Sequence, residues 1–442
     1  MPPLDGNLII HGDNLHALKA LLPYYAGKID CIFIDPPYNT GNENWAYNDN
    51  VDSPMMREWL SSNPVNIEDM LRHDKWLCMM YPRLKLLHEL LSDRGSLWMT
   101  LDDNEVHHAR MALDEIFTSP KPHVGSVIWQ KKYATKSDTE FFSESHDNIL
   151  VYAKNRELML FDGLQRTAKQ DANYKNLDGD PRGLWASDNL LRTEERDYAI
   201  FEIISPTGIP HLPPKGSSWR FGPDKITELL ADNRLWFGED GNNKPRLKRF
   251  LEDVQKRVPP QTIWSFSEVG HSDSAKKSLA DIFGSTDAPF ATPKPVELIE
   301  RILSIATDED SIVLDSFAGS GTTGHALLNL NRRDSGSRKF ILVECEGYAD
   351  QLTAGRMRRI IGGYTFRGSK REELLRERVT FSSLKKAGEI LNRIAGIQNL
   401  EGHRFDKVEK KIEDGNLTVV GLKNIEERVE GLGGAFTYCT LG

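Results

Sequence analysis

Cysteine, long apolar runs and excess positive charge are all scarce in this sequence of 442 residues. Its four cysteines, Cys31, Cys78, Cys345 and Cys439, lie far apart, which argues against a disulfide framework and shows no zinc-ligand spacing. No apolar stretch approaches the roughly 20 residues that cross a bilayer, and the opening MPPLDGN lacks the pattern of an export signal. These absences predict a cytoplasmic protein with no membrane partner and no metal site.

The balance of charge is negative. Lysine and arginine number 56 against 65 aspartates and glutamates, and the net charge of -9 by itself weighs against nucleic acid as a partner. The positive charge is clustered, however, and nucleic-acid binding needs a local basic surface rather than a basic total. Five residues of these clusters are candidate phosphate contacts, with ordinary solvated surface as the alternative: Lys131, Lys132, Arg246, Lys248 and Arg249.

Patterns typical of strands alternate with helical patterns in two parts of the chain. Strands are predicted at 7–12, 28–35, 96–101, 149–153, 311–317 and 340–344, and helices at 15–22, 71–91, 105–117, 296–305 and 322–330. The apolar run at 28–35 is typical of a buried parallel strand, and it stops at two prolines that cannot continue one. This alternation predicts a doubly wound α/β fold with a mostly parallel sheet.

The length of the chain predicts more than one domain. Residues 1–160 and 286–366 carry the α/β pattern. Between them, residues 161–285 are rich in Gly, Pro, Asn, Asp and Trp and show only short strand-like runs, which indicates an inserted irregular module. Residues 367–442 form a charged C-terminal extension that we expect to be helical at first.

The tetrapeptide Asp35-Pro36-Pro37-Tyr38 stands at the carboxyl end of the second predicted strand, where open α/β sheets hold their reactive loops. The exocyclic amine of a nucleobase is a poor nucleophile because its lone pair is delocalised into the ring. Asp35 and the Pro36 carbonyl are suited to accept its two N–H hydrogens and so free the lone pair. The prolines bring no competing N–H, and Tyr38 offers a face on which an extruded base stacks. The tetrapeptide predicts group transfer to a planar amine, with a plain strand-to-turn junction as the alternative.

A glycine-rich loop follows the strand at 311–317. Gly319, Gly321 and Gly324 match the dinucleotide-binding fingerprint, and Glu344 ends the next strand, where an acid binds ribose hydroxyls. Taken literally, this pattern predicts a nicotinamide-dependent dehydrogenase.

S-Adenosylmethionine suits the same loop. It has a ribose diol for Glu344 but no pyrophosphate, so it needs an open loop rather than a phosphate cradle. Asp315 is placed to reach toward its amino-acid portion, and Phe317 gives an apolar wall. A dehydrogenase has no use for a Pro-Pro-Tyr loop on the same sheet, so the two motifs together favour methyl transfer.

With these motifs in this order, the sequence resembles the β-class of DNA amino-methyltransferases, above all the modification (Mod) subunits of type III restriction–modification systems and related orphan methyltransferases. The resemblance covers most of the chain, and the segments that carry it are IDPPYNTGN at 34–42, SLWMTLDD at 96–103, SHDNILVYAKN at 145–155, TPKPVELIERI at 292–302 and the glycine-rich loop. It implies a Rossmann-like methyltransferase sheet and S-adenosyl-L-methionine as cofactor.

The resemblance also implies a substrate and partners. The DPPY form goes with N6 of adenine in double-stranded DNA, whereas N4-cytosine enzymes of the class usually carry Ser in the place of Asp35. The module at 161–285 would be the target-recognition domain. Members often form homodimers, and a restriction subunit is a further partner of the type III systems. The recognition module is shorter here than in type III Mod subunits, so a stand-alone methyltransferase is an equal expectation.

The cofactor site follows from the glycine-rich loop and from the resemblance together. The resemblance places Asp13 on the cofactor adenine and Thr292, Lys294 and Pro295 along the cofactor pocket. The complete set of expected cofactor-binding residues is Asp13, Thr292, Lys294, Pro295, Asp315, Phe317, Ala318, Gly319, Ser320, Gly321, Thr322, Thr323 and Glu344.

Other chemistry-bearing residues are given structural interpretations. Ser145-His146-Asp147 lie consecutively on a strand and cannot converge as a hydrolytic triad. His107 and His108 lack a third ligand and are expected on a helix surface. The leading hypothesis is therefore a DNA adenine-N6 methyltransferase. N4-cytosine or RNA adenine methylation, a nicotinamide dehydrogenase and a non-catalytic DNA-binding subunit stay open as alternatives.

Overall fold

The computed structural model describes residues 5–40, 72–135, 141–254, 257–380, 385–413 and 415–441. The chain divides into two compact units, one formed by Met1–Asp162 with Gln261–Gly442 and the other by Gly163–Pro260. Within the described residues, no helix combines the length and the apolar character needed to cross a bilayer.

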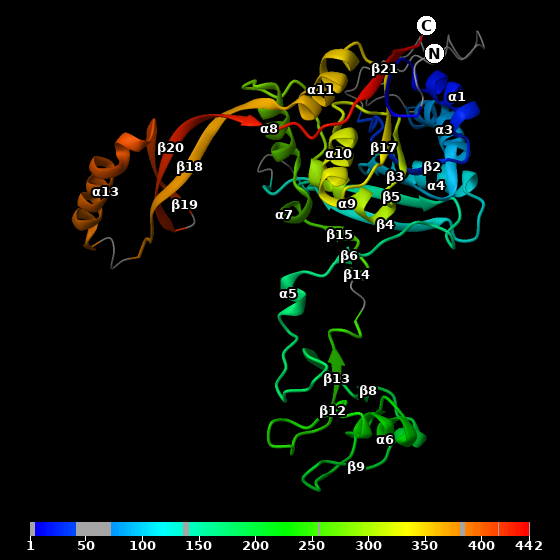
Figure 1. Cartoon of the computed structure of the whole chain (residues 1–442), viewed down its shortest axis with the longest axis vertical. Helices are drawn as coiled ribbons and strands as arrows, with labels where there is room; N and C mark the ends of the chain where they lie inside the picture. Colours follow the sequence, from blue (N-terminus) through cyan, green and yellow to red (C-terminus); the bar gives the residue numbers. More distant parts are fainter. Residues whose placement is uncertain are drawn as a thin grey trace. The chain divides into compact units, whose positions relative to one another are not determined.

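A nine-stranded sheet forms the centre of the first unit (Figure 1). Its strands are β1 (Asn7–His11), β2 (Ile29–Ile34), β3 (Leu91–Leu101), β4 (His123–Gln130), β5 (His146–Ala153), β15 (Ile263–Trp264), β16 (Ile312–Asp315), β17 (Lys339–Glu344) and β21 (Phe436–Thr440). They are arranged in the order β15-β4-β5-β3-β2-β16-β17-β1-β21. All neighbours are parallel except that β5 runs antiparallel to β3 and β4. The predicted doubly wound, mostly parallel sheet is confirmed.

Helices alternate with these strands along the chain. They are α1 (Asn14–Tyr25), α3 (Arg72–Leu90), α4 (Val106–Ile116), α7 (Phe266–Val269), α8 (Ser272–Phe283), α9 (Val296–Ala306), α10 (Thr322–Asp334), the π-helix η2 (Ala349–Ala354) and α11 (Gly355–Gly362). Helix α3 contacts both α1 and α4, while α10 contacts α9 and α11, and Figure 1 shows these two groups on opposite sides of the sheet. Every residue of β2 is buried, which explains its continuous apolar pattern, because parallel strands covered on both faces have no solvent side.

Two segments differ from the sequence-based expectations. Residues 261–285 lie outside the inserted unit, because Ile263–Trp264 pair with β4 in the central sheet. The expected helix after residue 367 is instead part of β18 (Tyr364–Arg378), which pairs antiparallel with β20 (Asn416–Val429) along nearly its whole length. Cross-strand pairing overrides the helix preference of the many Glu, Lys and Arg residues of β18.

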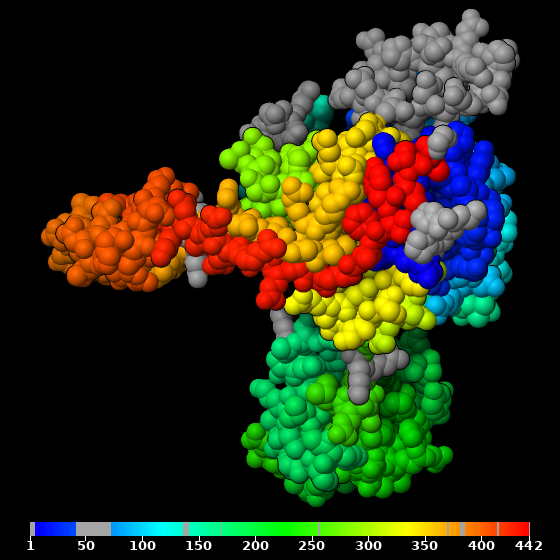
Figure 2. All heavy atoms as spheres, turned by 45° about the horizontal axis from the view of Figure 1, so that its top comes forward, coloured from blue at the N-terminus to red at the C-terminus, as the bar shows by residue number. Residues whose placement is uncertain are grey.

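The end of the chain returns to the central sheet. Strand β20 also pairs with β19 (Lys407–Glu413), and α13 (Ala387–Glu401) packs near this small sheet. Strand β21 then pairs in parallel with β1, and the C-terminal residues lie against the N-terminal ones in the space-filling view (Figure 2). The predicted extension at 367–442 therefore contributes its last strand to the main sheet.

The second unit, Gly163–Pro260, has its own small core. Its elements are β6 (Leu164–Gln165), α5 (Ala168–Asp171), β7 (Trp185–Asp188), β8 (Leu191–Arg192), the 3-10 helix η1 (Asp197–Ala199), β9 (Ile203–Ile204), β10 (Pro210–His211), β11 (Ser218–Trp219), α6 (Pro223–Ala231), β12 (Leu235–Trp236), β13 (Arg246–Phe250) and β14 (Arg257–Val258). Trp219, Ile226, Leu229 and Phe237 belong to its cluster of buried apolar residues. Short strands around a modest core agree with the irregular texture of this part of the sequence.

Candidate active site

The two sequence motifs meet because their strands are neighbours. The tetrapeptide follows β2 and the glycine-rich loop follows β16, and β2 and β16 pair in parallel. The carboxyl ends of parallel strands lie at the same edge of a sheet, and Glu344 at the end of the next strand, β17, joins them there. A cavity of about 1150 Å³ opens at this edge, and its lining includes residues from both motifs.

Most of the expected site residues line this one cavity. They are Asp35, Pro36, Pro37, Tyr38, Thr292, Lys294, Asp315, Phe317, Ala318, Gly319, Ser320, Thr322, Thr323 and Glu344. Three others are not part of the lining. Asp13 caps α1 by accepting from the Leu15 N–H at 2.9 Å, Pro295 precedes α9, and Gly321 takes the left-handed position before α10.

Asp35 is held by three donors. The hydroxyls of Tyr38 and Thr100 donate to Asp35 Oδ1 at 2.9 and 2.5 Å. The Lys294 ammonium donates to the other oxygen, Oδ2, and also lies 5.2 Å from the centre of the Tyr38 ring. Asp35 therefore has a fixed orientation, in which Oδ1 accepts from the two hydroxyls and Oδ2 accepts from the Lys294 ammonium.

Tyr38 connects Asp35 to a second ion pair. Its hydroxyl lies 3.3 Å from Asp147 Oδ2, and Lys131 Nζ lies 2.5 Å from Asp147 Oδ1. Burial, followed by the charges of Asp35 and Asp147, raises the pKa of Tyr38 well above that of a free phenol, so this residue stays a neutral donor. Burial also raises the pKa of the Asp147 carboxyl.

Hydrogen bonds fix the backbone on both sides of Tyr38. The indole N–H of Trp76 donates to the Pro37 carbonyl at 2.7 Å. Asn39 is buried and has a left-handed backbone, with φ of 59°, and its side-chain amide donates to Glu105 and to the Arg72 carbonyl. Asparagine is one of the few residues with a side chain that tolerates this backbone. The loop is thus tied to α3 and to the start of α4.

The glycine-rich loop is closely packed. A Cβ at Gly324 would stand 2.8 Å from Met357 Sδ, and one at Gly321 would stand 3.2 Å from the Thr353 carbonyl. Gly319 and Gly321 have positive φ of 50° and 77°. These positions need glycine because the loop turns sharply between β16 and α10 with α11 packed against it.

Two buried acids, Asp315 and Glu344, hold this loop in place. Asp315 accepts from the Phe317 N–H at 3.0 Å and from the Thr323 hydroxyl at 2.5 Å, while Glu344 accepts from the Gly319 N–H at 2.7 Å. Burial raises the pKa of Asp315 to about 7 and also raises the pKa of Glu344. Both acids are therefore positioned before any ligand arrives.

Sequence reasoning missed several lining residues. Asp147, Phe290 and Tyr348 come from three separate parts of the chain, and the rings of Phe290 and Tyr348 meet edge to face 5.7 Å apart. Thr100, which donates to Asp35 from beneath the lining, was missed as well. Asp147 was part of the rejected triad and of the resemblance segment at 145–155, but it was given no role in the site; β5 brings it to Tyr38. No local pattern assigns these residues a contact with Asp35 or Tyr38, because such contacts depend on strand order.

The five candidate phosphate contacts have different environments in the structure. Arg246 and Arg249 are exposed on β13, and Lys132 lines the cavity. Lys131 also lines the cavity and pairs with Asp147.

Lys248 contradicts the expectation of a phosphate contact. Its side chain is fully buried in ion pairs with Asp178 and Asp180, so it is a structural residue of the second unit.

The sheet order and the shared cavity define a doubly wound α/β protein in which the glycine-rich loop and the Asp35 carboxylate line one cavity at the carboxyl ends of the strands. Comparison with known proteins agrees and is more specific: residues 29–354 match the model of the N6_N4_Mtase family, described as DNA methylase. The chain belongs to this family.

Three relatives illustrate the similarity. The chain is 32% identical to the type III restriction–modification enzyme StyLTI Mod subunit of Salmonella typhimurium over 85% of its length, and 30% identical to the EcoP15I Mod subunit of Escherichia coli over 77%. It is 30% identical to the type II methyltransferase M.KpnI of Klebsiella pneumoniae over 78% of this chain and 82% of that protein. The matches span only 56% and 58% of the two Mod subunits.

Proposed function

We propose that this chain transfers a methyl group from S-adenosyl-L-methionine to N6 of an adenine that is flipped out of double-stranded DNA. The observation that carries the proposal is the single cavity that joins Asp35 to the glycine-rich loop. Its volume of about 1150 Å³ exceeds the roughly 300–1,000 Å³ of a typical small-molecule site, which leaves room for a cofactor and a base. Membership of the DNA methylase family supports this function over a nicotinamide dehydrogenase.

The residues around the glycine-rich loop fit S-adenosylmethionine. Glu344 stands at the strand end where a carboxylate accepts from ribose hydroxyls. The aromatic rings of Phe290 and Tyr348 and the side chain of Phe317 offer apolar surface, while the open loop has no phosphate to hold. When bound, this cofactor supplies an electrophilic methyl group.

Asp35 would orient the target amine. Because the hydroxyls of Tyr38 and Thr100 already occupy Oδ1, the substrate N–H has Oδ2 as its acceptor on Asp35. The Lys294 ammonium bonds this oxygen in the absence of substrate, so it marks the place that the amine takes. The Pro36 carbonyl would accept the second N–H, and the Tyr38 ring would stack on the base.

The same carboxylate would take the proton that the amine loses. As the N–C bond forms, the nitrogen becomes positively charged and its N–H becomes acidic, so Asp35 Oδ2 accepts that proton within hydrogen-bond distance. Flipping the base costs a few kcal/mol, which stacking and these hydrogen bonds offset.

Substrate and partners follow from the family resemblance. Asp35 at the first motif position favours adenine over cytosine, and the unit at 163–260, with Arg246 and Arg249 exposed, is proposed as the target-recognition domain. A homodimer and a restriction-subunit partner stay predictions, and sedimentation of the chain alone and with a restriction subunit tests both.

Incubation with tritiated S-adenosylmethionine and unmethylated genomic DNA tests the activity. We expect label in N6-methyladenosine after digestion to nucleosides, and its loss in Asp35→Ala. The matched control is Asp310→Asn, whose side chain is 79% exposed and which precedes β16, at the strand end opposite to the glycine-rich loop; it should keep full activity. Label in N4-methylcytosine would overturn the adenine assignment, and equal transfer by Asp35→Ala would overturn the mechanism.

A further inference from the structure

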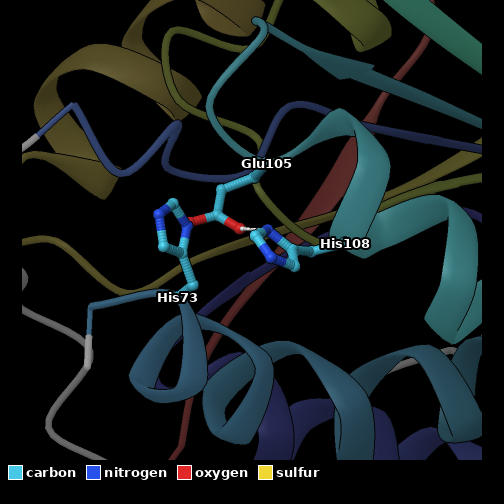
Figure 3. Close-up of side chains that lie close together, drawn as sticks. All are labelled: His73, Glu105 and His108. Carbon is cyan, nitrogen blue, oxygen red and sulfur yellow. Dashed lines mark hydrogen bonds and ion pairs between the residues drawn. The ribbon is translucent and has the colours of Figure 1, made fainter. Parts of the chain in front are cut away.

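Three side chains of types that ligate metal ions lie together outside the cavity, next to the loop 35–39 that follows β2, which we call the catalytic loop. His73 from the first turn of α3 and His108 from the first turn of α4 converge on Glu105, which directly precedes α4 (Figure 3). His73 Nδ1 lies 2.7 Å from Glu105 Oε1, and His108 Nδ1 lies 3.0 Å from Glu105 Oε2. The sequence showed no further ligand beside His107 and His108. The fold brings His73 from α3 and Glu105 to His108, whereas His107 is not part of the cluster.

We infer that His73, Glu105 and His108 form a binding site for one divalent cation of the zinc class, which clamps α3 to α4 behind the catalytic loop. Two imidazoles and a carboxylate are a donor set that zinc prefers, with water in a fourth position. The ligand atoms all lie within 4.8 Å of one another. A tetrahedral ion with bonds of about 2.0–2.1 Å needs them about 3.3 Å apart, so small side-chain rotations suffice.

The different burial of the three side chains suits the binding of a cation from solvent. The Glu105 side chain is fully buried, whereas the side chains of His73 and His108 are 30% and 25% exposed. The carboxylate is therefore held in the protein while the imidazoles face a route from solvent.

Arg72 opposes binding. Its Nε lies 3.3 Å from His73 Nε2 and donates to it, so His73 carries its own proton on Nδ1 in the cation-free state. A cation at Nδ1 displaces that proton, and the Arg72 charge disfavours this exchange.

Asn39 connects the site to the catalytic loop. The side-chain amide of Asn39, next to Tyr38, donates to the Glu105 carboxylate that would ligate the cation. Such outer partners orient a ligating carboxylate. A bound cation would thus hold Asn39, and with it the left-handed turn that follows the tetrapeptide.

Titration of the tag-free, full-length protein with Co²⁺ and Zn²⁺ tests the site. We expect one high-affinity ion per chain, a visible Co²⁺ spectrum of nitrogen and oxygen ligands, and a melting temperature that rises with Zn²⁺ concentration. His73→Ala and His108→Ala should each weaken binding at least about tenfold. The matched control, His107→Ala, removes an exposed neighbouring imidazole outside the cluster and should change the affinity less than twofold.

Two further variants keep the test decisive. Glu105→Gln retains an oxygen for the Asn39 amide but loses the ligand charge, so it should fold and bind at least tenfold more weakly. Arg72→Ala should bind severalfold more tightly.

Unchanged affinity in the His73, His108 and Glu105 variants, or the absence of stoichiometric binding to the wild type, would overturn the site. A thiolate charge-transfer band that disappears in Cys78→Ser would also overturn it, because Cys78 is an exposed cysteine on the same helix. None of these measurements depends on methyl transfer.

Discussion

Replacing Lys248 separates a structural role from a DNA-binding role. The Lys248 ammonium bonds Asp178, lies 3.4 Å from Asp180 Oδ2 and stands 5.4 Å from the centre of the Trp185 ring, and its side chain is fully buried. In Lys248→Met the stem still packs, but Asp178 loses its ion-pair partner. Asp180 keeps two bonds of 2.9 Å from Arg182. The loss falls mainly on Asp178, so we expect a cost of about 3 kcal/mol, the low end for breaking a buried ion pair.

The pH dependence of this cost follows from Asp178. Burial alone would raise the pKa of its carboxyl, but the bonds from Lys248 and Trp185 outweigh burial and lower it below its usual value. A carboxyl with a lowered folded-state pKa contributes stability above its unfolded pKa and loses that contribution as the pH falls through the folded value. The difference between wild type and Lys248→Met should therefore be complete at pH 7 and shrink below about pH 4.

Hydrogen exchange measures the effect locally, which suits a chain of two units whose unfolding need not be a single transition. Peptides covering 176–190 and 245–251 should exchange faster in Lys248→Met by the factor that corresponds to this free energy, about 150-fold. Arg249→Met, whose side chain is 60% exposed, is the matched control and should change stability by less than about 0.5 kcal/mol. If Lys248→Met instead kept its protection and lowered the salt dependence of DNA binding by about one phosphate contact, the structural reasoning would be refuted.

Three further predictions concern the site. Thr100→Val removes one donor from Asp35 and should lower kcat about tenfold with little change in the KM for the cofactor, measured by steady-state methyl transfer. Gly324→Ala should destabilise the protein by about 1–3 kcal/mol, because the added methyl group contacts Met357. In urea unfolding, the same substitution in a Met357→Ala background should cost less. Strictly additive effects of the two substitutions would contradict the contact. The pKa of Asp315 is raised by burial to about 7 in the folded protein, above its unfolded value, so ionisation of this group destabilises the folded state as the pH rises from about 4 to 7. Asp315→Asn should therefore be more stable than the wild type at pH 8, and this advantage should disappear near pH 4. Thermal unfolding of both proteins across this pH range checks the prediction.

The predictable part of the fold is the part governed by local pattern. The strand at 28–35 is recognisable because a doubly covered strand needs apolar residues throughout, and Pro36-Pro37 ends it for a steric reason. Strand β4 (His123–Gln130) was missed, and β18 was expected to be helical, because their pairing partners and not their own residues decide their conformation. The boundary of the irregular module at 285 was placed too late for the same reason, since Ile263–Trp264 form a strand only against β4.

The same division holds for the candidate site. The sequence by itself was enough to identify the tetrapeptide, the glycine-rich loop and Glu344 as parts of the candidate site. Each is recognisable from its neighbours within a few residues and from the strand that precedes it. Only the tertiary structure decided what surrounds Asp35: the Thr100 hydroxyl is 65 residues away in the chain and the Lys294 ammonium 259 residues away. It also turned Lys248 inward and brought His73 to His108 and Glu105. Such partners are set by strand order and helix packing. A linear pattern of residue types does not show which residues far apart in the chain these will bring together.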